Sequence, residues 1–203
     1  MPVIQTLLLT VLTLSVERYF TIRASFGRMK LSKFVEQIKD ALNNGDLGKA
    51  QELCDKQRGS VANVVSSTLR KYREMEKTND LTKEQKVLAI QKELEEATAL
   101  ELPMMQQNLP IIATITTLGT LMGLLGTVIG MIRSFAALSA GGGTDSVALS
   151  TGISEALINT AFGILTGALA VISYNYYTNK IDKLTYSLDE VGFSIVQTFA
   201  STH

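Results

Sequence analysis

Residues 109–132 read LPIIATITTLGTLMGLLGTVIGMI and lie in a stretch without charged side chains that extends from Glu101 to Arg133. A helix rises about 1.5 Å per residue, so one over 109–132 is long enough to cross a hydrocarbon core of about 30 Å. The stretch therefore predicts a transmembrane helix.

A second uncharged stretch covers residues 156–179, between Glu155 and Lys180. Its length again matches the roughly 20 residues that one membrane crossing requires. We therefore predict a further transmembrane helix over 155–179.

The N-terminal residues 1–22 are also apolar, but Glu17 and Arg18 interrupt them. We expect a short transmembrane helix here, with Arg18 extending to the membrane surface. Two explanations of its shortness stay open: the native chain begins upstream, or the helix tilts little and thins the bilayer locally. A signal peptide is not favoured, because no basic segment precedes the stretch and no small-x-small cleavage site follows it.

The composition excludes several classes of function. Nineteen basic and nineteen acidic residues balance, and no basic stripe is interleaved with aromatic residues, so nucleic acid is not an expected partner. The one histidine, His203, is the last residue and is expected to fray, while the one cysteine, Cys54, is expected to be a reduced cytoplasmic thiol. We find no nucleophile and base pair, phosphate-binding loop or metal cluster, and expect neither an enzyme nor a cofactor.

The basic residues predict the topology. Sixteen of the nineteen lie between Arg18 and Lys92, which places residues 23–108 in the cytoplasm by the positive-inside rule. Residues 133–154 carry one basic residue and are predicted to form a periplasmic loop, with a flexible glycine run at 141–145. The N-terminus is then periplasmic and the 180–203 tail cytoplasmic, as expected of a multi-pass protein of a bacterial inner membrane.

The segment 23–108 is predicted to be helical, because its apolar residues recur at helical spacing. Thr82 and Gln85 form a possible capping box for a helix that runs towards the second span, where Pro103 and Pro110 predict a bend or break. Apolar residues of the tail also recur every three or four positions, so the third helix should continue beyond the bilayer: Ile181, Leu184, Leu188, Val191 and Ile195. The predicted fold class is therefore all-α, a polytopic membrane protein whose three transmembrane helices extend into a helical cytoplasmic domain.

Small and hydroxyl residues recur along the second span. Gly119, Gly123, Gly126 and Gly130 fall on one narrow helix face, which we interpret as a surface for close helix packing. Thr116, Thr120 and Thr127 form a neighbouring stripe, although a membrane threonine usually bonds to its own helix.

The third span carries a polar stripe that includes Glu155, Asn159, Gly163 and Thr166. A charge at the bilayer centre costs about 2.5–3.5 kcal/mol, so Glu155 should face water, a partner or a pore. The alternative is that Glu155 caps the helix start, where the helix dipole favours a carboxylate. The residues alone do not decide between the two.

Two segments resemble the signatures of the MotA/TolQ/ExbB proton channel family. Residues 123–132, GLLGTVIGMI, with Ser134 and Phe135, resemble its second-span signature, and residues 152–163, GISEALINTAFG, resemble its third-span signature. Members of ExbB and TolQ type commonly carry proline at two places where this chain has Thr120 and Leu169.

The resemblance implies a homo-oligomer, usually a pentamer, around two copies of an ExbD/TolR-like single-span partner that carries the proton-accepting aspartate. It also implies that Thr127, Thr160 and Glu155 line the proton pathway. An ExbB-like motor subunit that energises a TonB-like protein with the proton motive force is the favoured function. The alternatives are a TolQ-like subunit for envelope maintenance and a non-conducting membrane scaffold. A MotA-type flagellar stator is less favoured, because the resemblance to that subfamily would imply four spans and a longer cytoplasmic domain.

Overall fold

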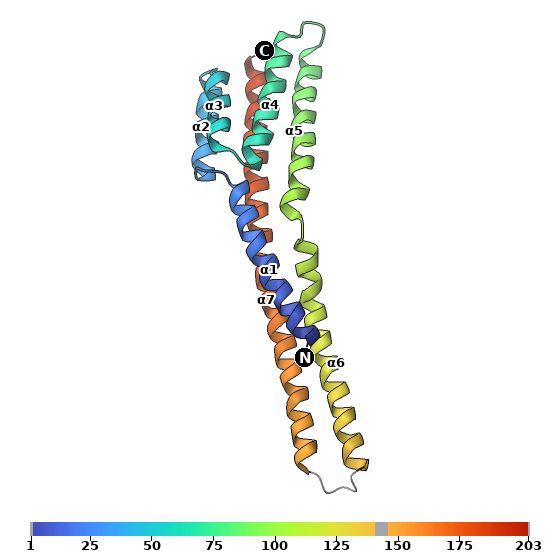
Figure 1. Cartoon of the computed structure of the whole chain (residues 1–203). Helices are drawn as coiled ribbons and strands as arrows, with labels where there is room; N and C mark the ends of the chain where they lie inside the picture. Colours follow the sequence, from blue (N-terminus) through green and yellow to red (C-terminus); the bar gives the residue numbers. More distant parts are fainter. Residues whose placement is uncertain (1, 141–145, 203) are drawn as a thin grey trace. The chain divides into compact units, whose positions relative to one another are not determined.

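The computed structural model describes residues 2–140 and 146–202 and is all-α there, as predicted (Figure 1). The predicted glycine run at 141–145 and His203 lie outside the described residues. The helices are α1 (Pro2–Ser25), α2 (Leu31–Asn43), α3 (Leu47–Gln57), α4 (Ser60–Lys77), α5 (Lys83–Gln106), α6 (Leu109–Ala140) and α7 (Ser146–Thr202).

The chain divides into two compact units. The first comprises Met1–Arg18 and Asn108–Tyr177, and the second comprises Tyr19–Gln107 and Thr178–His203. By length and composition, three helical stretches suffice to cross a membrane, namely Pro2–Ser25, Lys83–Ser139 and Leu149–Thr202. The helices do not themselves mark the membrane surfaces, so the span boundaries given above stay predictions.

In the first unit, α6 and the first part of α7 lie side by side and antiparallel (Figure 1). All four glycines of the α6 stripe lie on the face of α6 that contacts α7. A Cβ atom added to Gly123 would lie 3.0 Å from the Gly163 Cα, and one added to Gly130 would lie 2.7 Å from the Ala156 Cβ. The two backbones therefore approach so closely that a larger side chain would not fit between them.

The helix α7 contributes small residues to the same contact. A Cβ atom at Gly163 would lie 2.6 Å from the Gly123 Cα, and one at Gly167 would lie 2.7 Å from the carbonyl oxygen of Thr116. At the other end of the pair, a Cβ at Gly152 would overlap the Ser134 hydroxyl. Backbone packing thus continues along the helix pair from Gly167 to Gly152.

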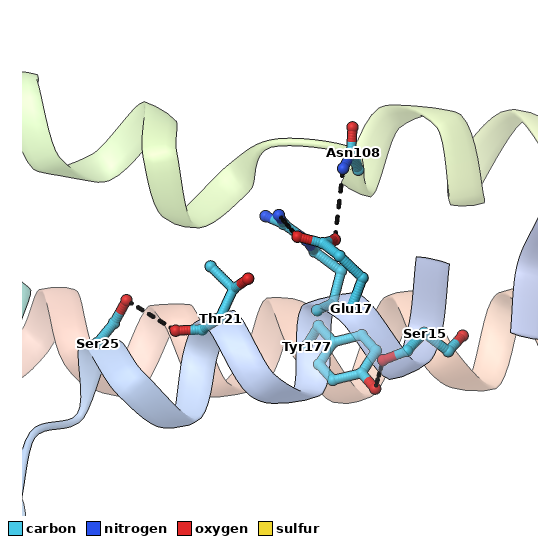
Figure 2. Close-up of polar contacts among 7 residues, drawn as sticks. Ser15, Glu17, Thr21, Ser25, Asn108 and Tyr177 are labelled. Atoms are coloured by element: carbon cyan, nitrogen blue, oxygen red, sulfur yellow. Dashed lines mark hydrogen bonds and ion pairs between the residues drawn. The ribbon is translucent and has the colours of Figure 1, made fainter. Parts of the chain in front are cut away.

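Two hydrogen bonds link α1 at Ser15 and Glu17 to the rest of the first unit (Figure 2). The Tyr177 hydroxyl of α7 donates to the carbonyl oxygen of Ser15 at 2.5 Å, and the Asn108 amide donates to the Glu17 carboxylate at 3.4 Å. Glu17 also forms an ion pair with Arg18, whose side chain is buried. The expectation that Arg18 extends to the membrane surface is wrong, because its side chain is almost fully buried and forms an ion pair with the exposed carboxylate of its neighbour Glu17.

The predicted break before the second span is present, but it lies between the two prolines. The helix α5 continues through Pro103 to Gln106, and α6 begins at Leu109. Asn108 has a positive φ of 65°, a conformation that asparagine tolerates better than most residues. Pro110 is the second residue of α6, where its missing N–H group would have had no partner within the helix.

Helical structure also extends into the predicted periplasmic loop, 133–154. The helix α6 continues to Ala140 and α7 begins at Ser146. Residues 133–140 read RSFAALSA, which contains good helix formers and neither glycine nor proline. The described residues of the predicted loop, 133–140 and 146–154, are therefore helical.

The second unit has its own core, to which α2, α3, α4 and the last turns of α7 contribute. The predicted capping box of Thr82 and Gln85 is present at the start of α5. All five apolar residues predicted for the tail are buried, and the Tyr72 and Phe199 rings pack edge to face at 4.8 Å. Lys39 of α2 and Glu190 of α7 form an ion pair at 2.5 Å. The prediction that the third helix continues far beyond 179 is confirmed, since α7 is one helix to Thr202.

The tight contact between α6 and α7 predicts that Gly163→Ala destabilises the protein. The added Cβ would lie 2.7 Å from the Gly119 carbonyl oxygen and 2.6 Å from the Gly123 Cα, so the two helices must separate. Overpacking of this kind costs about 1–3 kcal/mol. We expect a lower thermal unfolding midpoint in detergent, with Gly48→Ala as the control, since a Cβ at Gly48 meets nothing closer than 3.4 Å. An unchanged midpoint for Gly163→Ala would contradict the close packing.

Cys54 is predicted to react slowly with thiol reagents. Burial in α3, followed by the nearby charge of Asp55, raises its pKa to about 12. At pH 8 only about one thiol in ten thousand would then be the reactive thiolate. We expect iodoacetamide labelling to accelerate by more than about tenfold on unfolding in denaturant. The control is a Cys54→Ala protein with Glu52→Cys on the exposed side of α3, which should label rapidly in both states.

Candidate functional site

A polar cavity of about 370 Å³ lies between α6 and α7 in the first unit. Its charged lining residues are Arg133 of α6 and Glu155 of α7. Among the described residues, no ion pair joins these two side chains. The remaining lining residues are small, polar or aliphatic: Gly126, Ile129, Gly130, Ser134, Ala137, Gly152, Ala156 and Asn159.

Glu155 lies well inside α7. The helix begins at Ser146, and its first turn contains no acidic residue. The interpretation of Glu155 as a cap of the helix start is therefore wrong, because the residue lies more than two turns after Ser146, beyond the first four residues whose N–H groups lack a partner within the helix. Glu155 is exposed and lines the cavity, which is the kind of position expected of a carboxylate that faces water or a partner.

The two predicted pathway threonines both donate hydrogen bonds within the chain. The Thr127 hydroxyl donates to the Leu124 carbonyl oxygen of its own helix at 2.6 Å. The Thr160 hydroxyl of α7 donates to the Gly123 carbonyl oxygen of α6 at 3.0 Å. Thr160 thus lies at the contact between the helices, and each hydroxyl oxygen retains lone pairs that can accept a further hydrogen bond.

The other predicted threonines bond to their own helices. Thr116 donates to Ile112, Thr120 to Thr116, and the buried Thr166 to Phe162. Of the three hydroxyls, that of Thr120 lies close to α7, since a Cβ at Gly167 would lie 2.7 Å from its oxygen.

Asn159 and Gly163 occupy the face of α7 that contacts α6. A Cβ at Gly126 would lie 3.0 Å from the Asn159 Cβ, and Gly163 packs against Gly119 and Gly123. The structure therefore brings Asn159 and Glu155 to one cavity, with Thr160 directly beside the α6 backbone. Much of the predicted polar stripe of α7 is turned towards α6 of the same chain.

Sequence reasoning missed four residues of this region. Gly152 and Gly167 complete the contact surface of α7, and Arg133 and Ser134 line the cavity. Small residues at 152, 156, 163 and 167 recur four residues apart at both ends of the span, which is the signal that could have identified this second small-residue stripe. Arg133 and Ser134 carry no such signal, because their position depends on how α6 rotates against α7.

No group of three or more His, Cys, Asp or Glu residues suited to a metal ion occurs within residues 2–140 and 146–202. A larger groove of about 1060 Å³ lies in the second unit, between α2 and α7, and the Lys39–Glu190 ion pair is part of its wall. None of the predicted site residues lines it.

Comparison with known proteins identifies relatives in one family. The family model described as the MotA/TolQ/ExbB proton channel family matches residues 59–190, which is more than half of the chain. The match includes all of α6 and most of α7, and with them every residue of the candidate site.

Three relatives, of ExbB and TolQ type, share modest sequence identity with the chain. An ExbB-like protein of Synechocystis sp. is 38% identical over 86 residues, which are 41% of each chain. The Tol-Pal system protein TolQ of Haemophilus influenzae is 33% identical over 104 residues, 46% of each chain. A protein of Methanothermobacter thermautotrophicus named as an ExbB homolog is 26% identical over 157 residues, 77% of this chain and 51% of the relative.

The chain thus spans about half the length of the curated relatives that it matches. The family match covers the two segments that resemble the family signatures, and the all-α structure supplies three helices long and apolar enough to cross a membrane. This protein therefore belongs to the MotA/TolQ/ExbB proton channel family.

Proposed function

We propose that this chain is an ExbB-like subunit of an inner-membrane proton channel that uses the proton motive force to energise a TonB-like protein. The observation that carries the proposal is the position of Glu155. This carboxylate is exposed in a polar cavity inside an otherwise apolar helix pair, within the segment that matches the family model. A charged side chain in an apolar membrane helix costs free energy, so its presence there favours a functional role.

The energy source is sufficient for such a motor. One elementary charge that crosses 100 mV releases about 2.3 kcal/mol. Threonine hydroxyls at the channel wall can donate and accept hydrogen bonds without carrying a charge, so Thr127 and Thr160 suit a proton pathway. The proton-accepting aspartate would belong to an ExbD/TolR-like single-span partner inside a ring of copies of this chain, with five as the expected number.

The proposed orientation has the N-terminus in the periplasm and the C-terminus in the cytoplasm. Sixteen of the nineteen basic residues lie from Arg18 to Lys92, which favours a cytoplasmic location for α2 to α5. In this orientation the cavity with Glu155 lies towards the periplasmic end of α6 and α7, where protons enter under the physiological gradient.

The ring would be assembled through surfaces other than the glycine stripe. The stripe of α6 is occupied by α7 of the same chain, so it is not open to a neighbouring subunit. Large apolar side chains on other faces of the pair are exposed in the single chain, among them Leu121, Leu124, Leu157, Ile164 and Ile172. These side chains suit contact with neighbouring subunits and with lipid.

A TolQ-like role in envelope maintenance is the nearest alternative. The TolQ protein of Haemophilus influenzae and the ExbB protein of Salmonella typhimurium are 33% and 32% identical to this chain over similar lengths. A non-conducting scaffold is favoured by a different observation, namely that the Thr127 and Thr160 hydroxyls already donate to carbonyl oxygens of the chain.

Replacement of both pathway threonines by valine separates a channel from a scaffold. Thr127→Val with Thr160→Val preserves the side-chain shape and removes the hydroxyls. We expect gradient-driven proton flux to fall by about tenfold or more when the complex with an ExbD/TolR-like partner is reconstituted in liposomes. Flux is measured with a pH-sensitive dye inside the vesicles.

The matched control is Thr114→Val, because Thr114 also lies on α6 and donates only to Pro110 of its own helix. The control should leave flux unchanged. If the double variant conducts at the wild-type rate, the assignment of Thr127 and Thr160 to the pathway is wrong.

Glu155→Gln tests the carboxylate itself. Glutamine has nearly the same shape and can still form hydrogen bonds, but it cannot take up and release a proton. We expect loss of proton flux while the mass of the detergent-extracted complex stays unchanged. Retained flux with the wild-type mass would remove Glu155 from the mechanism.

A further inference from the structure

A cluster of positive charge lies where α1 ends and α2 begins. Its four exposed cations, which we call the basic surface, are Arg23, Arg28, Lys30 and Lys33. No acidic residue occurs between Glu17, which is paired with Arg18, and Glu36. Within the part of the chain that the structure describes, none of the four cations forms an ion pair. The charge of the basic surface is therefore available to an anionic partner.

The helix α7 adds a fifth cation beside this surface. The Lys180 ammonium lies 5.9 Å from the centre of the Phe26 ring, and Phe26 belongs to the connection between α1 and α2. An ammonium group is attracted to an aromatic ring at this distance. The next charged residues of α7, Asp182 and Lys183, carry opposite charges, so Lys180 increases the positive charge near the basic surface.

The connection that carries Arg28 and Lys30 is held in one conformation by Gln57 of α3. The Gln57 side chain is fully buried, accepts a hydrogen bond from the Met29 N–H group at 2.9 Å and donates to the Phe26 carbonyl oxygen at 2.8 Å. The Arg28 N–H group donates to the Gln57 carbonyl oxygen at 2.9 Å. The two cations are thus presented on a fixed backbone, which reduces the entropy that is lost when they bind a partner.

Exposed aromatic and apolar side chains precede the basic surface on α1. The Tyr19 and Phe20 rings are 43% and 64% exposed and pack edge to face at 5.6 Å. Leu12, Val16 and Phe20 are all exposed and recur every four residues, which places them on one face of the helix. Aromatic residues are enriched at membrane–water interfaces. The order of apolar, aromatic and basic residues along α1 therefore matches the order of hydrocarbon, interface and head groups in a lipid leaflet.

We propose that the basic surface, together with Lys180, binds the phosphate groups of anionic phospholipids in the leaflet that the end of α1 reaches. Clusters of four to eight Lys and Arg residues next to a membrane helix are typical of proteins that bind anionic lipids. A phospholipid matches both parts of this region, because its phosphate pairs with the cations while its acyl chains contact the apolar face of α1. A soluble anion would contact the cations alone.

The test measures lipid binding to the whole chain in mixed detergent micelles, where orientation across a bilayer has no influence. Phosphatidylglycerol is the anionic probe and phosphatidylcholine the zwitterionic one, and native mass spectrometry counts the bound lipid. We expect phosphatidylglycerol to bind at least about tenfold more tightly, because each cation near a lipid surface contributes about fivefold. High salt should reduce the difference, since it screens exposed charges.

A combined variant, Arg28→Gln with Lys30→Gln and Lys33→Gln, removes three cations of the basic surface. All three residues are exposed, so the substitutions leave the core intact. We expect phosphatidylglycerol to bind at least about tenfold more weakly, with phosphatidylcholine binding unchanged. A variant that preserves charge, Arg28→Lys with Lys30→Arg and Lys33→Arg, should bind phosphatidylglycerol as wild type does.

The matched control removes three exposed cations elsewhere in the second unit, namely Lys49→Gln, Lys77→Gln and Lys83→Gln. The control has the same net charge as the combined variant and should bind phosphatidylglycerol as wild type does. Wild-type affinity in the combined variant, or an equal loss in the control, would overturn the proposal. Displacement of the lipid by inorganic phosphate at equal concentration would also overturn it, because the surface would then bind soluble anions. Proton flux is not measured, so the result is independent of the proposed function.

Discussion

The structure of the first unit depends on the contact between the backbones of α6 and α7. Helices in hydrocarbon gain little from the hydrophobic effect, so they associate through short-range dispersion and hydrogen bonds. Gly123 and Gly163 meet at the contact, where an added Cβ would lie within 3.0 Å of the opposing Cα. The same closeness lets the Thr160 hydroxyl reach the Gly123 carbonyl oxygen, so a side chain that belongs to the polar stripe of α7 also links the two helices.

The polar cavity lies beside this contact. Gly126 and Gly130 pack closely against Asn159 and Ala156, and Arg133 and Glu155 line the cavity from opposite helices. One set of small residues therefore serves both the packing of the pair and the polar site next to it. The contact also restricts assembly, because a glycine stripe that packs against its own chain leaves the apolar faces with Leu124 and Ile164 for neighbours and lipid.

The sequence predicted the fold class and much of its internal detail because those features depend on local chemistry. The uncharged stretch of the second span, the capping box at Thr82 and the periodic apolar residues of the tail each act over a few neighbouring residues, and the structure contains all three. The break before α6 was predicted from prolines but lies at Asn108, because proline is tolerated in the first turn of a helix and the positive φ falls on asparagine. The predicted position of the Arg18 side chain was wrong, because the order of residues along the chain does not show that this side chain is buried and paired with Glu17.

The sequence by itself determined that the chain is helical, that three stretches suit a membrane, and which residues form the glycine and hydroxyl stripes. These properties follow from composition and from the period of the helix. Only the tertiary structure decided what each stripe contacts, because the rotation of one helix against another depends on every side chain along their interface. It turned the α6 glycines towards α7, brought Arg133 into the cavity with Glu155, and excluded Glu155 as a cap by starting α7 at Ser146.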